Sequence, residues 1–113
     1  MPATDEGDAS GTPGGDAFGG TEGRDDDVVL TLVNRRGLHA RAAARFVREL
    51  QPLDVEVVVL KDGQAVDGRS IMGLLMLGAP CGSTIRVRAR GPDAKAAVAS
   101  LTALVTGGFG EAD

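Results

Sequence analysis

The chain has 113 residues with a net charge of −4, and 42% of them are hydrophobic, but only 3% are aromatic, with no Trp or Tyr. This length suits one domain and leaves little room for a second independent core. No apolar run approaches the length that spans a membrane, and one cysteine and one histidine exclude an intrachain disulfide and a structural Cys/His zinc site.

The charge is divided unevenly along the chain. Residues 1–27 hold seven glycines and eight acidic residues against one basic residue, a net charge of −7, so residues 28–113 carry +3. Phe18 is the only apolar side chain larger than valine between Pro2 and Asp27. Such a stretch buries too little surface to offset its ordering entropy. We therefore expect residues 1–27 to be a disordered acidic tail without secretory character, and residues 28–111 to form a cytoplasmic domain.

The first half of the domain begins with a β-favourable apolar run at residues 28–33. Apolar residues then recur at helical spacing up to Pro52, which predicts an amphipathic helix; they are Ala43, Phe46, Val47 and Leu50. A second β-branched run covers residues 55–60, and Asp62-Gly63 separates it from residues 65–67. Asp-Gly between two such runs indicates a hairpin, because a primed turn needs residues that tolerate positive φ.

The second half begins with Ser70, a favoured N-cap, before a short apolar helix that Gly78 ends. Residues 84–90 alternate between apolar side chains and arginines, which predicts a strand with one face in water. A last helix follows, with Pro92 in its first turn and Gly107 just beyond its end.

These elements follow the order βαββαβα. We expect the α/β (α+β) class and an open-faced sandwich, in which three helices cover one face of a four-stranded antiparallel sheet and arginines line the other. The last long strand is expected between the first two strands, as in a split βαβ unit.

The only histidine, His39, lies between a glycine-containing loop and the first helix. This position at or beside the N-cap is unusual for histidine, because Ser, Thr, Asn or Asp would satisfy the free amides better. The alternative is an exposed loop histidine without a function. The free amides and positive dipole end of a helix attract anions, and Arg41 adds a guanidinium suited to phosphate oxygens. A neutral imidazole at this position is predicted to accept and hold a phosphoryl group.

Basic residues are concentrated around this histidine. Five of the eleven basic residues in the folded part lie within ten positions of it: Arg35, Arg36, Arg41, Arg45 and Arg48. Such a cluster suits a phosphate or an acidic partner surface, although a solvated helix face explains Arg45 and Arg48 equally well.

Two stretches carry a resemblance to a known family. The segment Gly37-Leu38-His39-Ala40-Arg41, followed by an alanine-rich helix, and the segment GRSIMGLLMLG at residues 68–78 resemble the signatures of HPr. HPr proteins are the histidine phosphocarriers of the phosphoenolpyruvate-dependent phosphotransferase system. The resemblance implies that His39 accepts a phosphoryl group on Nδ1 from phosphorylated enzyme I and passes it to enzyme IIA domains. It implies a monomeric, stoichiometric carrier that is no enzyme itself and needs no metal or cofactor, with Arg41 stabilising the phosphate.

The resemblance also implies a regulatory site and a docking surface. Ser70 matches a serine that a dedicated HPr kinase/phosphorylase modifies in some members, although its role as N-cap explains it equally. The residues that match the docking patch for enzyme I and IIA are Ala44, Arg48, Ile71, Met72 and Leu75. The apolar ones among them are alternatively part of the core. Ala42 departs from the family pattern, which has proline after the active-site arginine.

Three alternatives stay open at this point. The chain is either a relay or an HPr-like regulatory binding module controlled at Ser70, and a relay serves either sugar uptake or a nitrogen-related regulatory branch, toward which Ala42 leans. An RNA-binding sheet face is disfavoured because stacking aromatics are missing, so neither nucleic acid nor membrane is expected as a partner. The acidic tail is either a solubilising extension or a transient cover for the arginines around His39.

Overall fold

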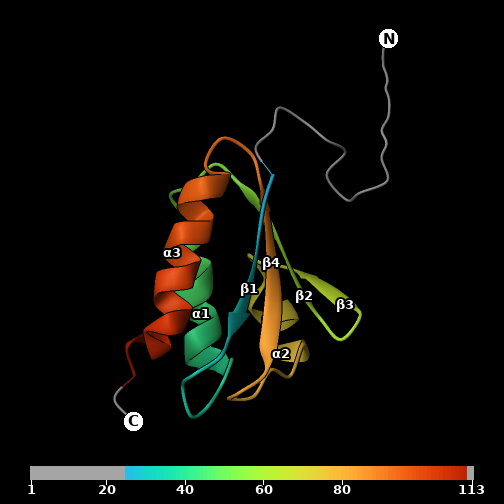
Figure 1. The fold of residues 1–113 in the computed structure, drawn as a ribbon, viewed down its shortest axis with the longest axis vertical. Coiled ribbons are helices and arrows are strands. Elements are labelled where there is room, and N and C mark those ends of the chain that lie inside the picture. The colour runs from blue at the N-terminus through green and yellow to red at the C-terminus, as the bar shows by residue number, and fades with distance from the viewer. Residues whose placement is uncertain (1–24, 112–113) are drawn as a thin grey trace.

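The element order predicted from the sequence is the one found in a computed structural model, which describes residues 25–111 (Figure 1). The elements are β1 (Asp25–Thr31), α1 (Ala40–Leu50), β2 (Glu56–Lys61), β3 (Gln64–Asp67), α2 (Ile71–Met76), β4 (Thr84–Arg90), α3 (Ala94–Thr106) and the 3₁₀ turn η1 (Gly108–Gly110).

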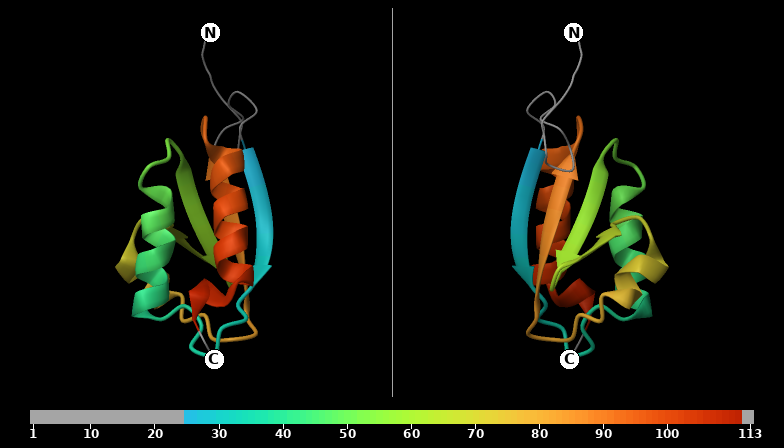
Figure 2. Two further views of the ribbon diagram at one scale, coloured as in Figure 1. Left: turned by 90° about the vertical axis from the view of Figure 1, so that its left-hand side faces the viewer. Right: turned by 90° about the vertical axis from the view of Figure 1, so that its right-hand side faces the viewer.

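The four strands form one sheet in the order β1-β4-β2-β3, and all neighbours are antiparallel. Val87 of β4 lies opposite both Val28 of β1 and Val59 of β2, so β4 lies between the first two strands, as predicted. The helices lie together on one side of the sheet (Figure 2). This arrangement confirms the open-faced sandwich.

The core lies between the sheet and the helices. In β4 the apolar residues Ile85, Val87 and Ala89 are buried, and the intervening arginines lie on the open face, where Arg88 pairs with Asp27 at 3.4 Å. The helices contribute buried residues at helical spacing: Ala43, Phe46 and Leu50 from α1, and Ala94, Ala97, Leu101 and Val105 from α3. The periodicities read from the sequence are therefore the ones that build the core.

Local signals placed the hairpin turn and the N-cap of α2 correctly. Asp62 and Gly63 connect β2 and β3 with φ of 51° and 82°, as a primed hairpin turn requires. Ser70 is the N-cap of α2, and its Oγ accepts a hydrogen bond from the Gly73 N–H at 2.9 Å.

Two expectations need correction. The first strand begins at Asp25 rather than residue 28 and ends at Thr31, so it takes in three residues of the stretch expected to be disordered. Asp25 and Asp27 lie opposite Arg90 and Arg88, and these acid–base neighbours extend the ladder. Residues 1–24 lie outside the described part. Pro92 precedes the N-cap of α3, Asp93, rather than standing in the first turn.

None of the helices in the described range 25–111 is long and apolar enough to cross a membrane.

Candidate functional site

His39 is the N-cap of α1, as the sequence predicted. Its backbone is extended, with φ of −81° and ψ of −178°, and its side chain makes no capping hydrogen bond. The first helical bond runs from the Ala43 N–H to the His39 carbonyl at 2.8 Å, so the amides of residues 40–42 have no intrahelical acceptor. Ala42, whose N–H a proline would lack, is fully buried, whereas Ala40 and Arg41 are exposed. The helix start therefore offers donors to an anion next to the imidazole.

The loop before His39 is held tightly against the segment between α2 and β4. The Leu38 N–H donates to the Ala79 carbonyl at 2.9 Å, and the His39 N–H donates to the Gly37 carbonyl at 2.9 Å. Gly37 has φ of +65°, and a methyl group on it would lie 2.3 Å from the Ala79 oxygen. A residue without Cβ is required there, and the loop fixes where the helix and its histidine begin.

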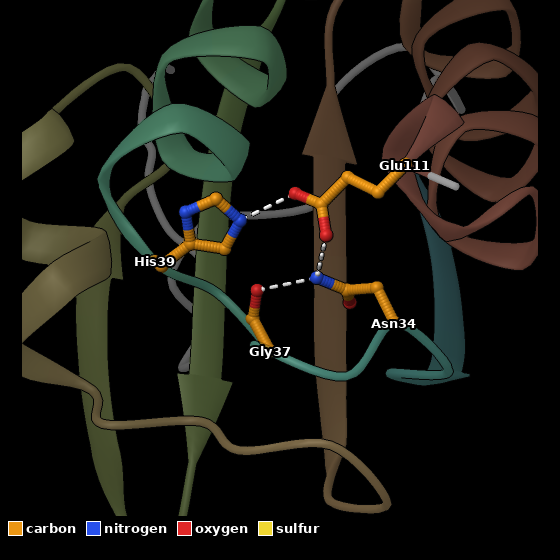
Figure 3. Close-up of polar contacts among 4 residues, drawn as sticks. All are labelled: Asn34, Gly37, His39 and Glu111. Carbon is orange, nitrogen blue, oxygen red and sulfur yellow. Dashed lines mark hydrogen bonds and ion pairs between the residues drawn. The ribbon is translucent and has the colours of Figure 1, made fainter. Parts of the chain in front are cut away.

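An acidic residue near the end of the chain completes the site. Glu111 Oε2 forms a hydrogen bond with Nε2 of His39, and Glu111 Oε1 accepts from Asn34 Nδ2 at 3.1 Å (Figure 3). Asn34 Nδ2 also donates to the Gly37 carbonyl at 2.8 Å. The side chains of His39 and Glu111 are 20% and 14% exposed, so the contact is largely shielded from water. A chain of contacts thus links the histidine to the loop that precedes it.

The turn η1 explains why Glu111 reaches His39. Gly108, Phe109 and Gly110 all have positive φ, of 66°, 58° and 72°, which reverses the chain after α3. The Phe109 side chain is fully buried in the core and anchors this turn. Glu111 was not predicted from the sequence. The available signal was one large apolar residue enclosed by glycines, directly before a carboxylate.

The electrostatics of the site favour an ionised carboxylate. The hydrogen bond with His39 lowers the pKa of Glu111 most, and burial partly opposes this effect. The hydrogen bond from Asn34 and the electrostatic interactions with His39 and Arg36 lower the pKa of Glu111 further.

The arginines of α1 take different positions. Arg41 is exposed in the first turn, and within residues 25–111 its guanidinium has no hydrogen-bond or ion-pair partner, which leaves it available to an anion. The Arg45 guanidinium lies against η1, since its Nη1 would be 3.3 Å from a methyl group on Gly110. Arg48 is exposed in the last turn of the helix. Arg41, the arginine that the sequence favoured, is therefore available to an anion, whereas the Arg45 guanidinium lies against the terminal turn.

An exposed apolar surface lies on α2, which packs beside α1. Its residues, here called the α2 patch, are Ile71, Met72 and Met76, with exposures of 40%, 66% and 74%. Met76 was not among the predicted docking residues. Leu75 and Ala44 are half-buried, and Leu74 and Leu77 belong to the core, so α2 contributes both core residues and exposed apolar side chains.

Comparison with known proteins decides the family. The family model described as "PTS HPr component phosphorylation site" matches residues 28–107. The chain belongs to the HPr family. It is 40% identical over 83 residues to "Phosphocarrier protein HPr" of Cupriavidus necator, which covers 74% of this chain and 93% of that protein. It is 37% identical to "Phosphocarrier protein NPr" of Shewanella violacea, over 74% of this chain and 91% of that one. The crystal structure of HPr-C-His from Thermoanaerobacter tengcongensis superimposes with a TM-score of 0.75 at 35% identity, covering 78% of this chain and 99% of that one.

The names of these relatives describe phosphocarriers, and membership of the HPr family supports a phosphocarrier role for this chain. The family match ends at residue 107, so Phe109 and Glu111 lie beyond the matched region.

Proposed function

We propose that the chain is a cytoplasmic, stoichiometric phosphoryl carrier that accepts a phosphoryl group on Nδ1 of His39 from phosphorylated enzyme I and passes it to enzyme IIA domains. The observation that carries this proposal is the orientation of the imidazole. Nε2 is engaged by Glu111, whereas Nδ1 lies on the side of the ring away from Glu111 and has no hydrogen-bond partner within the described residues (Figure 3).

The geometry fits an in-line transfer. The lone pair of Nδ1 attacks phosphorus, the bond from phosphorus to the donor breaks, and its electron pair stays with the donor. In this proposal the amides of residues 40 and 41, which have no intrahelical acceptor, and the exposed guanidinium of Arg41 stabilise the three phosphoryl oxygens. Positioning and charge stabilisation are the main requirements of such a transfer.

Partner docking is assigned to the α2 patch together with Ala44, Arg48 and Leu75. Exposed apolar side chains next to a basic helix suit a partner surface with an apolar centre and acidic edges. Met72→Asp is expected to weaken phosphorylation by enzyme I through a higher KM. Val29→Asp is the matched control, because Val29 is 56% exposed on the open sheet face, opposite Arg86. Equal KM values for both variants would argue against this docking surface.

The carrier chemistry is tested by intact mass. The chain is incubated with enzyme I, phosphoenolpyruvate and magnesium, beside the variants His39→Ala and Ser70→Ala. One acid-labile phosphoryl adduct is expected on the native chain and on Ser70→Ala, and none on His39→Ala. An adduct that persists on His39→Ala would contradict the assignment.

A second function, an HPr-like binding module switched at Ser70 by a kinase, is favoured by one observation. Ser70 directly precedes Ile71 and Met72 of the α2 patch, so a phosphate there would place negative charge at the apolar surface. Absence of any adduct with an active cognate enzyme I would favour this function. The nitrogen-related branch stays part of the proposal, with assay against IIA domains of both branches as its test.

A further inference from the structure

We propose that Glu111 is a positioning residue that holds His39 in the tautomer with the proton on Nε2, so that the reactive lone pair lies on Nδ1. This inference rests on the proposed function, because it explains how the acceptor nitrogen is selected.

The hydrogen-bond pattern fixes the direction of each bond. Each Glu111 oxygen has its own partner: Oε2 contacts Nε2 of His39, and Oε1 contacts Nδ2 of Asn34. An ionised carboxylate only accepts hydrogen bonds, so both partners must donate. A neutral imidazole carries one proton, and donation from Nε2 leaves Nδ1 as the nitrogen with the lone pair.

The orientation of Asn34 supports this assignment. Its Nδ2 faces two acceptors, the Gly37 carbonyl and Glu111, so the amide cannot be reversed without setting its oxygen against both. Asn34 is 2% exposed, and its Oδ1 is buried without a partner among the described residues. Leaving this oxygen unsatisfied costs free energy, and the two hydrogen bonds that Nδ2 donates, one of them to Glu111, offset that cost.

The same contact stabilises the ring as transfer proceeds. The imidazole gains positive charge when its Nδ1 lone pair forms the bond to phosphorus, and the carboxylate at Nε2 stabilises that charge. The negative phosphoryl oxygens stay on the opposite side of the ring, beside the helix amides. No proton has to leave Nδ1 in this step, because the proton is already on Nε2.

Two arginines lie near the segment that carries Glu111. Arg36 from the preceding loop acts on the carboxylate, and the Arg45 guanidinium of α1 lies against the adjoining Gly110. The contact between Glu111 and His39 also depends on η1, which brings Glu111 back to the start of α1.

The first test reads the tautomer directly by long-range ¹H–¹⁵N correlation of the imidazole, at a pH where the ring is neutral. The chain has a single histidine, so its signals need no assignment. Wild type is expected to show Nε2–H as the dominant form. Glu111→Gln is expected to raise the Nδ1–H population, because its amide offers one acceptor oxygen to two donors. Glu49→Gln, an exposed glutamate of α1, is the matched control and should leave the tautomer unchanged.

The second test is the rate of phosphorylation by enzyme I. Glu111→Gln should slow phosphorylation on the order of tenfold, the lower end of what the outer partner of a metal-ligating histidine contributes, whereas Glu49→Gln should not slow it. Glu111→Asp keeps the charge but is one methylene shorter, so it should act in the same direction, and it provides a second variant if the first folds poorly.

An unchanged tautomer, or a rate that is unchanged or raised in Glu111→Gln, overturns the proposal; a raised rate would mark the contact as inhibitory instead. Failure of wild type to be phosphorylated would refute the proposed function separately. The tautomer measurement needs no phosphoryl donor and still decides whether Glu111 positions the ring.

Discussion

Replacing Gly37 by alanine tests whether the loop before His39 is held by close packing. Gly37 and Gly78 have nearly equal φ, +65° and +60°, but they differ in surroundings. A methyl group on Gly37 would lie 2.3 Å from the Ala79 oxygen and 2.7 Å from Pro80 Cα, whereas nothing lies within 4 Å of one on Gly78. Both substitutions lose roughly 1–2 kcal/mol to the left-handed backbone. Only Gly37→Ala adds the backbone displacement, about 1–3 kcal/mol.

Urea denaturation of both variants separates the two contributions. With a slope of about 1 kcal/mol per molar urea for a small domain, the midpoint of Gly37→Ala should lie about 1 M or more below that of Gly78→Ala. The displaced loop should also disturb the His39 resonances, which Gly78→Ala should leave in place. Equal midpoints for the two variants would show that the loop yields freely and would refute the packing argument.

Three further predictions concern the terminal turn and α2. Phe109→Ala should destabilise the domain by about 3–5 kcal/mol, because the side chain is fully buried, and thermal denaturation should show a lower Tm; a loss below about 1 kcal/mol would mean that the turn does not anchor the chain end. The pKa of Glu111 lies below its ordinary value of 4.5 because of its hydrogen bonds with His39 and Asn34. The stability that this contact contributes is therefore fully present above pH 4.5 and is lost as the pH falls through the lower pKa of the folded state. An acid titration of Glu111 followed by NMR measures this pKa, and a midpoint at or above 4.5 would contradict the prediction. Ser70→Ala should cost roughly 0.5–2 kcal/mol through the lost N-cap, whereas Ser70→Asp should retain most of it; urea midpoints in the reverse order would speak against the capping role.

The elements were predictable because their signals are local. Alternation in residues 84–90, Asp62-Gly63 between two β-branched runs and Ser70 before an apolar stretch each act within a few residues. His39 at the start of a helix is local in the same sense. The start of β1 at Asp25 was missed, since its acidic residues are stabilised by arginines of β4 that only pairing brings opposite them.

The partner of His39 could not be predicted in this way. The contact with Glu111 joins residues 72 positions apart, and it depends on three consecutive residues with positive φ. Only the folded chain shows that Phe109 is buried while its neighbours reverse the backbone. The packing of the Arg45 guanidinium against Gly110 likewise shows only in three dimensions, because the two residues are 65 positions apart in sequence.

The insertion of β4 between β1 and β2 has a consequence for how the protein is made. During synthesis β1 leaves the ribosome first, but its partner is a strand whose opposing residues lie up to 65 positions later, from Asp25 to Arg90. Until β4 emerges, only the β2–β3 hairpin can pair, and β1 has no neighbouring strand. Contacts this distant in sequence close late, because the loop entropy must be overcome before they form. The histidine and its glutamate therefore meet only after nearly the whole domain has been translated, so a partly synthesised chain carries the acceptor residue without its site.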